Sequence, residues 1–222
     1  TFTDHPVRED EDAEKYTKVL REVYVQCDAE LGKTRAALPA DTTLFVMSDH
    51  GFMRFSRKLS LNTWLLENGL ITLKDEEVRT GSLNEVAESS KTKAYSLGLN
   101  AIYLNLKGRE PFGSVEPQDR EAVLTELTDK LMAARDPKNN RPVVKTVYRT
   151  DKVYHGDYAP GGKHDEHTPD IIVGLHREYV VRLGAQGDIN KKWIYDNTGE
   201  WSADHCVAAE LVPGILLSNG CL

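Results

Sequence analysis

A short apolar run at residues 44–47, Leu-Phe-Val-Met, leads almost directly into Asp49, His50 and Gly51, and this junction limits the folds open to the chain. A strand that is apolar on both faces is typical of a parallel sheet covered by helices. In α/β sheets of that kind, ligands bind beyond the carboxyl ends of the strands, which is where Asp49 and His50 fall. The junction therefore predicts an α/β fold with a ligand-binding edge at residues 49 and 50.

Asp49 and His50 have the chemistry of a metal site. A carboxylate oxygen beside an imidazole nitrogen suits zinc or a similar divalent ion, and Gly51 allows a sharp turn that would aim both at one centre. The alternative is an ordinary strand-end turn with a hydrogen-bonded Asp. A distant histidine, His205 in the segment WSADHC, could add a third ligand or could bond to a backbone carbonyl. Both alternatives stay open on the residues alone.

Hydrophobic periodicity predicts the elements around these motifs. Apolar residues three to four apart predict an amphipathic helix from Tyr16 to Leu31, which Gly32 would end. Trp64 is expected in the core of a second helix that ends near Gly69. The remaining predictions are a polar loop at residues 74–91, strands at 102–106, 141–156, 170–175 and 216–217, and a helix at 121–134.

These elements predict three segments in an α/β chain. Residues 1–73 form a core segment with the Asp-His-Gly motif, 74–168 a loop and an inserted cap subdomain, and 169–222 a C-terminal core segment with the second metal motif. A chain of 222 residues is long enough to bury a core of its own.

The composition limits the kinds of molecule that the chain is expected to bind. A formal net charge of −7 argues against a general nucleic-acid binder, because neutralising phosphates requires clustered Lys and Arg. No apolar run reaches the length of a membrane span. Three cysteines without CxxC spacing favour a reducing compartment, so a cytoplasmic location is predicted.

Five ordered segments carry a resemblance to a known family. They are FVMSDHGF, LSLNTWLLENG, KTKAYSLGLNAIYLNLKGREPFG, DIIVG and WSADHCVAAELVPGILLSN. Together they resemble the prokaryotic type I phosphodiesterase/nucleotide pyrophosphatase branch of the alkaline phosphatase superfamily, over nearly the whole chain. The resemblance implies part of an alkaline-phosphatase-like, mostly parallel sheet flanked by helices, with an inserted α+β cap subdomain.

The resemblance also implies a chemistry. A Ser or Thr nucleophile would attack phosphorus and form a covalent phospho-enzyme, helped by two divalent metal ions. Asp49 and His50 would bind one ion and His205 the other, with Zn²⁺ the expected metal and Mn²⁺ the alternative. The substrate would be a small-molecule phosphate ester or a nucleotide. Asn100 and Arg109, in the predicted cap, are candidate substrate contacts, although a buried turn Asn and a surface Arg are equally good interpretations.

The chain also departs from the family pattern. The family's first half supplies a strand-end Asp, the Ser or Thr nucleophile and an Asp-x-x-x-His pair, and none of them is in place here. The opening TFTDHPVRED resembles the segment that follows that pair. We therefore expect the C-terminal part of a longer hydrolase, with its nucleophile upstream and little activity in this chain alone.

Four other histidines could be interpreted as metal ligands, but we favour a different interpretation for each. His5 would need an Asp four residues earlier, so a solvated turn before Pro6 is preferred. His155, His164 and His167 lie in or beside a Gly-rich segment that looks like an insertion relative to the family pattern. A solvated loop is the better prediction for that segment.

Two rival functions remain open. A phosphomonoesterase, sulfatase or phosphomutase of the same superfamily would share the metal site and differ in the cap. A non-catalytic domain of the same fold would bind a ligand or partner through the loops at residues 74–91 and 158–168.

Overall fold

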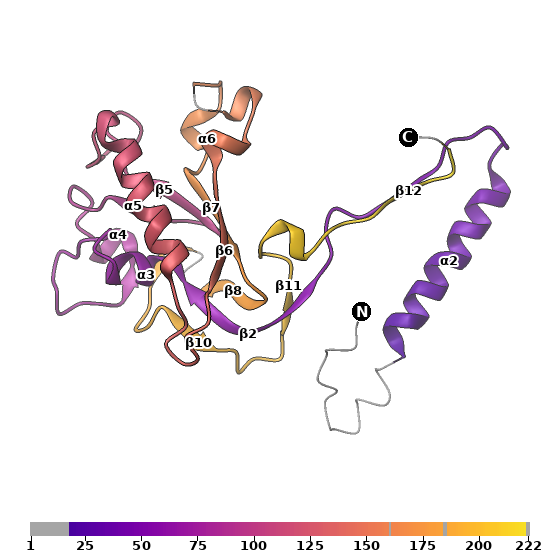
Figure 1. Cartoon of the computed structure of the whole chain (residues 1–222), viewed down its shortest axis with the longest axis horizontal. Coiled ribbons are helices and arrows are strands. Elements are labelled where there is room, and N and C mark those ends of the chain that lie inside the picture. The colour runs from indigo at the N-terminus through magenta and orange to yellow at the C-terminus, as the bar shows by residue number, and fades with distance from the viewer. Residues whose placement is uncertain (1–17, 160, 184–185, 221–222) are drawn as a thin grey trace. The chain divides into compact units, whose positions relative to one another are not determined.

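The computed structural model describes residues 18–159, 161–183 and 186–220 (Figure 1). The chain divides into two compact units. The terminal unit comprises Thr1–His50 and Gly214–Leu222, and the central unit comprises Gly51–Pro213. His5, Tyr16 and Cys221, which the sequence analysis considered, lie outside the described residues.

The terminal unit begins, in its described part, with the helix α2 (Val19–Ala37). The prediction that Gly32 ends this helix is wrong, because one interior glycine costs only about 1 kcal/mol and does not stop a helix. The helix ends at Leu38, whose extended backbone is the conformation favoured before a proline such as Pro39. Neither α2 nor any other helix in the described part of the chain is long and apolar enough to cross a membrane.

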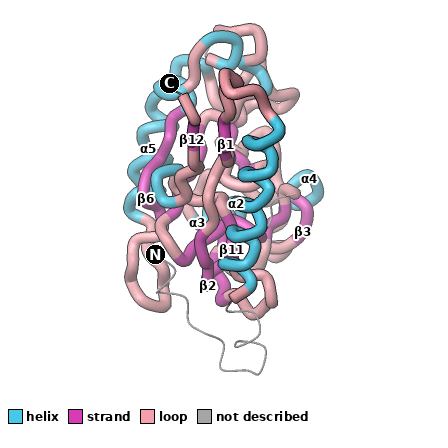
Figure 2. Tube along the Cα trace, turned by 90° about the vertical axis from the view of Figure 1, so that its right-hand side faces the viewer, coloured by secondary structure: helices cyan, strands magenta, loops and turns pink. Residues whose placement is uncertain are grey.

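Two short strands complete the terminal unit. β1 (Phe45–Met47) runs antiparallel beside β12 (Leu216–Ser218), as Figure 2 shows. Asn219 joins the end of β12 to the segment just before β1. Its Oδ1 accepts the Leu44 N–H at 2.8 Å, and its Nδ2 donates to the Thr42 carbonyl at 2.9 Å. The predicted strands at 44–47 and 216–217 are confirmed.

The apolar side chains of the terminal unit remain largely exposed. Met47 is 71% exposed and Leu217 57%, and no residue of α2 is buried. A two-stranded sheet of this length is marginally stable by itself. The unit therefore presents apolar surface of the kind that a larger sheet normally buries.

The first sheet of the central unit has four antiparallel strands in the order β4-β5-β7-β6. Their bounds are Ala94–Ser96, Ala101–Leu104, Ile171–Leu175 and Val144–Arg149. The helix α5 (Arg120–Ala133) contributes its apolar side chains Val123, Leu124, Leu127 and Leu131 to the same core as these strands. The strands and the helix predicted for these segments are confirmed, with the strand at 141–156 ending at Arg149.

The second sheet is built on the long strand β2 (Met53–Ser60). Antiparallel neighbours of β2 are β10 (Ile194–Asp196) and β11 (Ala203–Asp204), and its parallel neighbour is β8 (Glu178–Leu183). β2 leads directly into α3 (Leu61–Glu67), where Ser60 caps the helix by accepting the Thr63 N–H. Trp64 on α3 is 5% exposed, so its predicted core position is confirmed.

Short elements complete the central unit. They are β3 (Gly81–Ser82), α4 (Leu83–Val86), α6 (Thr150–Val153), β9 (Asp188–Ile189) and four 3₁₀ turns at Pro117–Asp119, Gly156–Tyr158, Asp165–His167 and Ala209–Leu211. The segment 74–91, predicted as a loop, thus contains a strand that pairs with β9 and a helical turn. Buried Val86 and Ala87 anchor that segment to the core, which polar composition alone did not indicate.

The α/β class is correct, but the strand directions differ from the prediction. Among the described residues every strand pair except β2–β8 is antiparallel, so the mostly parallel sheet is not formed by them. One reason is local, because β4 and β5 are joined by a connection too short for a parallel crossover. The three predicted segments at 1–73, 74–168 and 169–222 stay a prediction: β2 of the first pairs with strands of the third, while β7 of the third pairs with β5 and β6 of the second.

Candidate metal centre

Asp49 and His50 follow the end of β1 in the terminal unit. The Asp49 Oδ1 accepts the backbone N–H of His50 at 3.0 Å, and the Asp49 Oδ2 lies 3.4 Å from the His50 Nε2. The Asp49 side chain is 85% exposed and that of His50 is 28% exposed. The hydrogen-bonded turn that the sequence allowed is therefore present, and it holds a carboxylate beside an imidazole, the pair of groups that zinc binds.

Close approach of the backbone explains two glycines beside this motif. A Cβ at Gly51 would lie 3.1 Å from the Pro213 carbonyl oxygen, within the central unit. A Cβ at Gly214 would lie only 2.2 Å from the Ser48 carbonyl oxygen, within the terminal unit. Strand pairing thus continues into the turn without room for side chains, and this fixes the backbone that carries Asp49.

Asp204, His205 and Cys206 lie at the end of β11 in the central unit, where Asp204 pairs with Met53 of β2. One ligand atom from each of the three residues lies within 4.8 Å of the others. The Asp204 Oδ1 accepts the backbone N–H groups of His205 at 2.7 Å and Cys206 at 3.0 Å. The Asp204 carboxylate therefore fixes the backbone of the two residues that follow it.

Asp204 is already engaged by a cation. Its Oδ2 lies 2.5 Å from the Arg182 Nη2, and the carboxylate is 6% exposed. Burial alone would raise the pKa of Asp204, but the backbone N–H groups of Cys206 and His205, together with Arg182, hold that pKa below its ordinary value. Burial and the neighbouring Asp204 charge raise the pKa of the Cys206 thiol to about 11, so this thiol is protonated at neutral pH.

His205 lies between a carboxylate and an aromatic ring. Its Nδ1 lies 3.6 Å from the Asp204 Oδ1, and its side chain is 41% exposed. The Phe52 ring meets the imidazole edge-on, with centroids 5.6 Å apart and an interplanar angle of 80°. Metal-binding histidines generally turn one ring nitrogen toward a carboxylate and bind the metal through the other. The Asp204 carboxylate therefore lies near the His205 ring, beyond hydrogen-bond distance, and a divalent ion at His205 stays a prediction.

The comparison with protein families matches residues 5–204 to the family described as Type I phosphodiesterase / nucleotide pyrophosphatase. The chain belongs to this family. No curated protein and no solved structure matches the chain. Membership in this phosphodiesterase family supports a hydrolase that acts on small-molecule substrates and agrees with the possible metal-binding group at Asp204, His205 and Cys206.

In this phosphodiesterase-family chain the two predicted substrate contacts have structural partners. The Arg109 side chain is 14% exposed, and its Nη2 donates to Asp170 at 2.7 Å and to the Leu104 carbonyl at 2.6 Å. The Asn100 Nδ2 donates to the carbonyls of Val173 at 2.7 Å and Cys206 at 3.1 Å. Asn100 thereby connects β7 to the segment that carries His205, and the substrate role of both residues stays a prediction.

The Gly-rich segment brings no further metal group together among the described residues. His164 packs against the Tyr158 ring at a centroid distance of 5.2 Å, and the His167 side chain is 73% exposed. Neither belongs to a described set of three or more potential ligands. The interpretation of this segment as a solvated loop stays a prediction.

Sequence reasoning singled out His205 and missed its two supporting residues. Asp204 directly precedes His205, just as Asp49 precedes His50, and this repeated Asp-His pair was a signal available in the sequence. Arg182 gave no comparable signal, because it lies on β8 and reaches Asp204 only through the pairing of β8 and β11 with β2. The pair Arg182–Asp204 is thus a product of the tertiary fold.

We expect Arg182→Met to weaken Zn²⁺ binding at His205 by about tenfold to a hundredfold, the usual effect of disturbing a residue that orients a metal ligand. Without the guanidinium, the Asp204 carboxylate keeps its backbone N–H donors but loses the cation that pairs with its Oδ2, so its position beside His205 is less restrained. Isothermal titration of Zn²⁺ into the metal-free chain measures the change, with Arg21→Met on the exposed face of α2 as control. Tighter binding by Arg182→Met would instead identify Asp204 as a ligand that Arg182 competes for.

Proposed function

We propose that this chain is the metal-binding part of a phosphoric-ester hydrolase of the phosphodiesterase/nucleotide pyrophosphatase type. Asp49 and His50 would bind one divalent ion, and His205 a second. The observation that carries this proposal is the pair of Asp-His motifs, each at the end of a strand, in a chain of this family. In both motifs the Asp side chain accepts the N–H of its own histidine, which fixes an imidazole beside a carboxylate.

These residues would have two roles, which are to bind the metal ions and to orient the ligands. Asp49 offers an exposed carboxylate that can neutralise part of a cation's charge, and His50 offers an imidazole nitrogen. His205 offers an imidazole nitrogen, while Arg182 and the backbone N–H of His205 hold the Asp204 carboxylate 3.6 Å from the ring. When bound, divalent ions of this kind would polarise phosphoryl oxygens and stabilise developing negative charge. Zn²⁺ is the expected metal because the ligand set mixes imidazole and carboxylate, and Mn²⁺ is the alternative.

We further propose that the Ser or Thr nucleophile lies in polypeptide outside residues 1–222. The apolar surface of the terminal unit supports this idea, because β1 and β12 expose Phe45, Met47 and Leu217 where a larger sheet would bury them. Polypeptide that extends this sheet would bring the nucleophile to the carboxyl end of β1, next to Asp49. The chain alone is then expected to show little hydrolytic activity.

Hydrolysis of a chromogenic phosphodiester and of its monoester counterpart tests the proposal. The chain is compared with a form extended by its native upstream sequence, with Zn²⁺ or Mn²⁺ added. We expect metal-dependent turnover in the extended form and preference for the diester. His205→Ala should lower kcat/KM at least about a hundredfold, since metal catalysis supplies several kcal/mol of transition-state stabilisation.

His167→Ala, in the exposed loop, is the matched control and should leave the rate unchanged. A preference for the monoester would assign the chain to another activity of the superfamily. Absence of turnover in both forms, with Zn²⁺ still bound, would contradict the hydrolase and favour a non-catalytic ligand-binding domain.

A further inference from the structure

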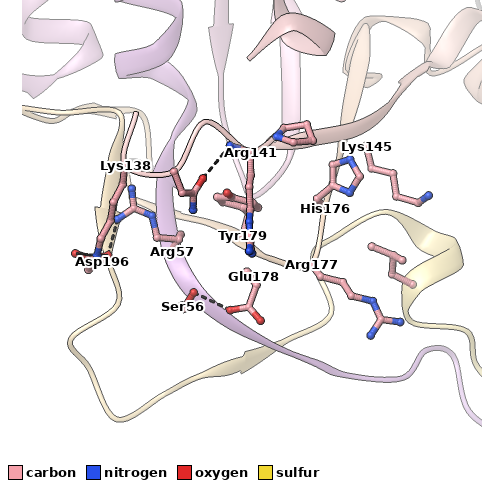
Figure 3. Close-up of a pocket in the computed structure, with 13 residues that line it drawn as sticks. Ser56, Arg57, Lys138, Arg141, Lys145, His176, Arg177, Glu178, Tyr179 and Asp196 are labelled. Atoms are coloured by element: carbon pink, nitrogen blue, oxygen red, sulfur yellow. Dashed lines mark hydrogen bonds and ion pairs between the residues drawn. The ribbon is translucent and has the colours of Figure 1, made fainter. Parts of the chain in front are cut away.

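A cavity of about 520 Å³ opens in the central unit around the turn that joins β7 to β8 (Figure 3). Its walls come from β2, β6, β8, β10, the loop at residues 138–142 and the last 3₁₀ turn. Small-molecule sites in proteins typically measure between about 300 and 1,000 Å³. This cavity is therefore large enough for an organic ligand, and none of the residues assigned above to metal binding lines it.

The lining of the cavity is cationic, although the whole chain carries a net charge of −7. Two carboxylates face it, those of Glu178 and Asp196. Against them stand five basic side chains, namely Arg57, Lys138, Arg141, Lys145 and Arg177. A cavity lined by one sign of charge concentrates ligands of the opposite sign, so the expected ligand is an anion.

Both carboxylates that line the cavity already form ion pairs or hydrogen bonds within the protein. Asp196 pairs with Arg57 at 2.5 Å and with Lys138 at 3.0 Å, as the left part of Figure 3 shows. Glu178 accepts a hydrogen bond from the Ser56 hydroxyl at 2.7 Å. Neither carboxylate therefore pairs with the arginines on the other sides of the cavity.

Arg141 and Arg177 are the cations left for a ligand. Within the described residues neither guanidinium has a carboxylate partner, and both residues are exposed at the cavity. Lys145 lies beyond His176 in Figure 3 and is only loosely held, at 3.3 Å from Glu210. A guanidinium presents a planar fork of N–H donors that matches the oxygens of a phosphate group.

A rigid floor supports these side chains. Arg57 is 8% exposed and donates through Nε and Nη2 to buried Asp136, at 2.8 and 2.6 Å. The Tyr179 hydroxyl lies 3.3 Å from the same carboxylate. Glu178, which follows the turn, has a left-handed backbone with φ at 78°. This conformation costs a non-glycine residue about 1–3 kcal/mol and persists only where the surrounding structure holds it.

His176, on the same turn, lies in a partly buried environment with nearby positive charges. Burial lowers the pKa of His176, and the nearby charges of Lys145 and Arg135 lower it further. Its backbone N–H donates to the Val143 carbonyl at 2.9 Å, which ties the turn to the loop that carries Arg141. Pro142 and Leu211 add apolar surface beside the cations, as a site for an organic molecule needs.

We propose that this cavity binds a phosphorylated small molecule, whose negative charge is met by Arg141 and Arg177 on different sides of the cavity and whose organic part lies against Pro142 and Leu211. The site is separate from the metal-binding residues and does not depend on the proposed function. Lys138 and Lys145 add long-range attraction for the anion at the cavity rim.

Isothermal titration of AMP into the full chain in the presence of EDTA tests the proposal, because the chelator removes any phosphate binding through metal. AMP should bind, and adenosine, which lacks the phosphate, should bind at least about tenfold more weakly. The double variant Arg141→Gln/Arg177→Gln should weaken AMP binding at least about a hundredfold, about tenfold for each charged hydrogen-bond donor removed. Arg21→Gln/Arg35→Gln on exposed α2 removes the same charge elsewhere and should leave the affinity unchanged.

Amide chemical shifts provide a second readout that also reports on folding. Signals of Arg177 and neighbouring residues should move on addition of AMP, and those of the double variant should match the native spectrum without moving. Equal affinities for AMP and adenosine, an unchanged affinity of the double variant, or no binding at millimolar AMP would each overturn the proposal.

Discussion

Replacing Asp170 by alanine is expected to lower the free energy of unfolding of the central unit by about 3–5 kcal/mol, the range for breaking a buried ion pair. Asp170 is 2% exposed and directly precedes β7. Its Oδ1 accepts Arg120 at 2.9 Å, while its Oδ2 accepts Arg109 at 2.7 Å and the Leu104 N–H at 2.8 Å. Alanine would remove a carboxylate that two partly buried guanidinium groups share, and it would leave the buried Leu104 N–H without its acceptor.

Chemical denaturation followed by circular dichroism measures this loss. Glu30→Ala serves as the control, because the ion pair between Glu30 and Lys33 on α2 is about as short, at 2.6 Å, yet both side chains are at least 70% exposed. Exposed pairs of this kind contribute about 0–1 kcal/mol. A loss in Asp170→Ala no larger than that of the control would show that solvent replaces the carboxylate and that the network does not hold the sheet.

Gly214→Ala is expected to disrupt the β1–β12 pair and displace the turn that carries Asp49 and His50. The new Cβ would lie 2.2 Å from the Ser48 carbonyl oxygen and 3.0 Å from that of Asp49. Both atoms belong to the backbone, so the clash cannot be relieved by rotating a side chain. Overpacking of this kind typically costs about 1–3 kcal/mol.

Hydrogen exchange at the Ser48 amide measures the effect, since this N–H donates to the Ile215 carbonyl at 3.0 Å across the pair. Its protection should fall by about tenfold to a hundredfold, the equivalent of that energy. Gly220→Ala in the same unit is the control, because the nearest atom to its Cβ would be 4.0 Å away. Native protection of Ser48 in Gly214→Ala would mean that the turn can shift without opening the strands.

Local patterns in the sequence predicted elements well where one face is buried. The apolar residues of α5 recur every three to four positions, and α3 carries Leu61, Leu65 and Leu66. Both patterns lie within a short stretch, so they can be recognised from the sequence itself. The end of α2 was misplaced because a glycine signal was given more weight than the proline that follows Leu38. The strand directions were also missed, since a run such as Ile171–Leu175, buried in the core, reads alike in parallel and antiparallel sheets.

The sequence alone determined which groups are available for metal chemistry, because the adjacency of Asp49 to His50 and the presence of His205 are properties of the chain itself. Only the tertiary structure decided how those groups are supported. Arg182 reaches Asp204 because β8 and β11 both pair with β2, and the cationic cavity gathers side chains from seven separate segments. Such contacts depend on strand register and on which segments meet in space, and no local pattern of residues encodes either one.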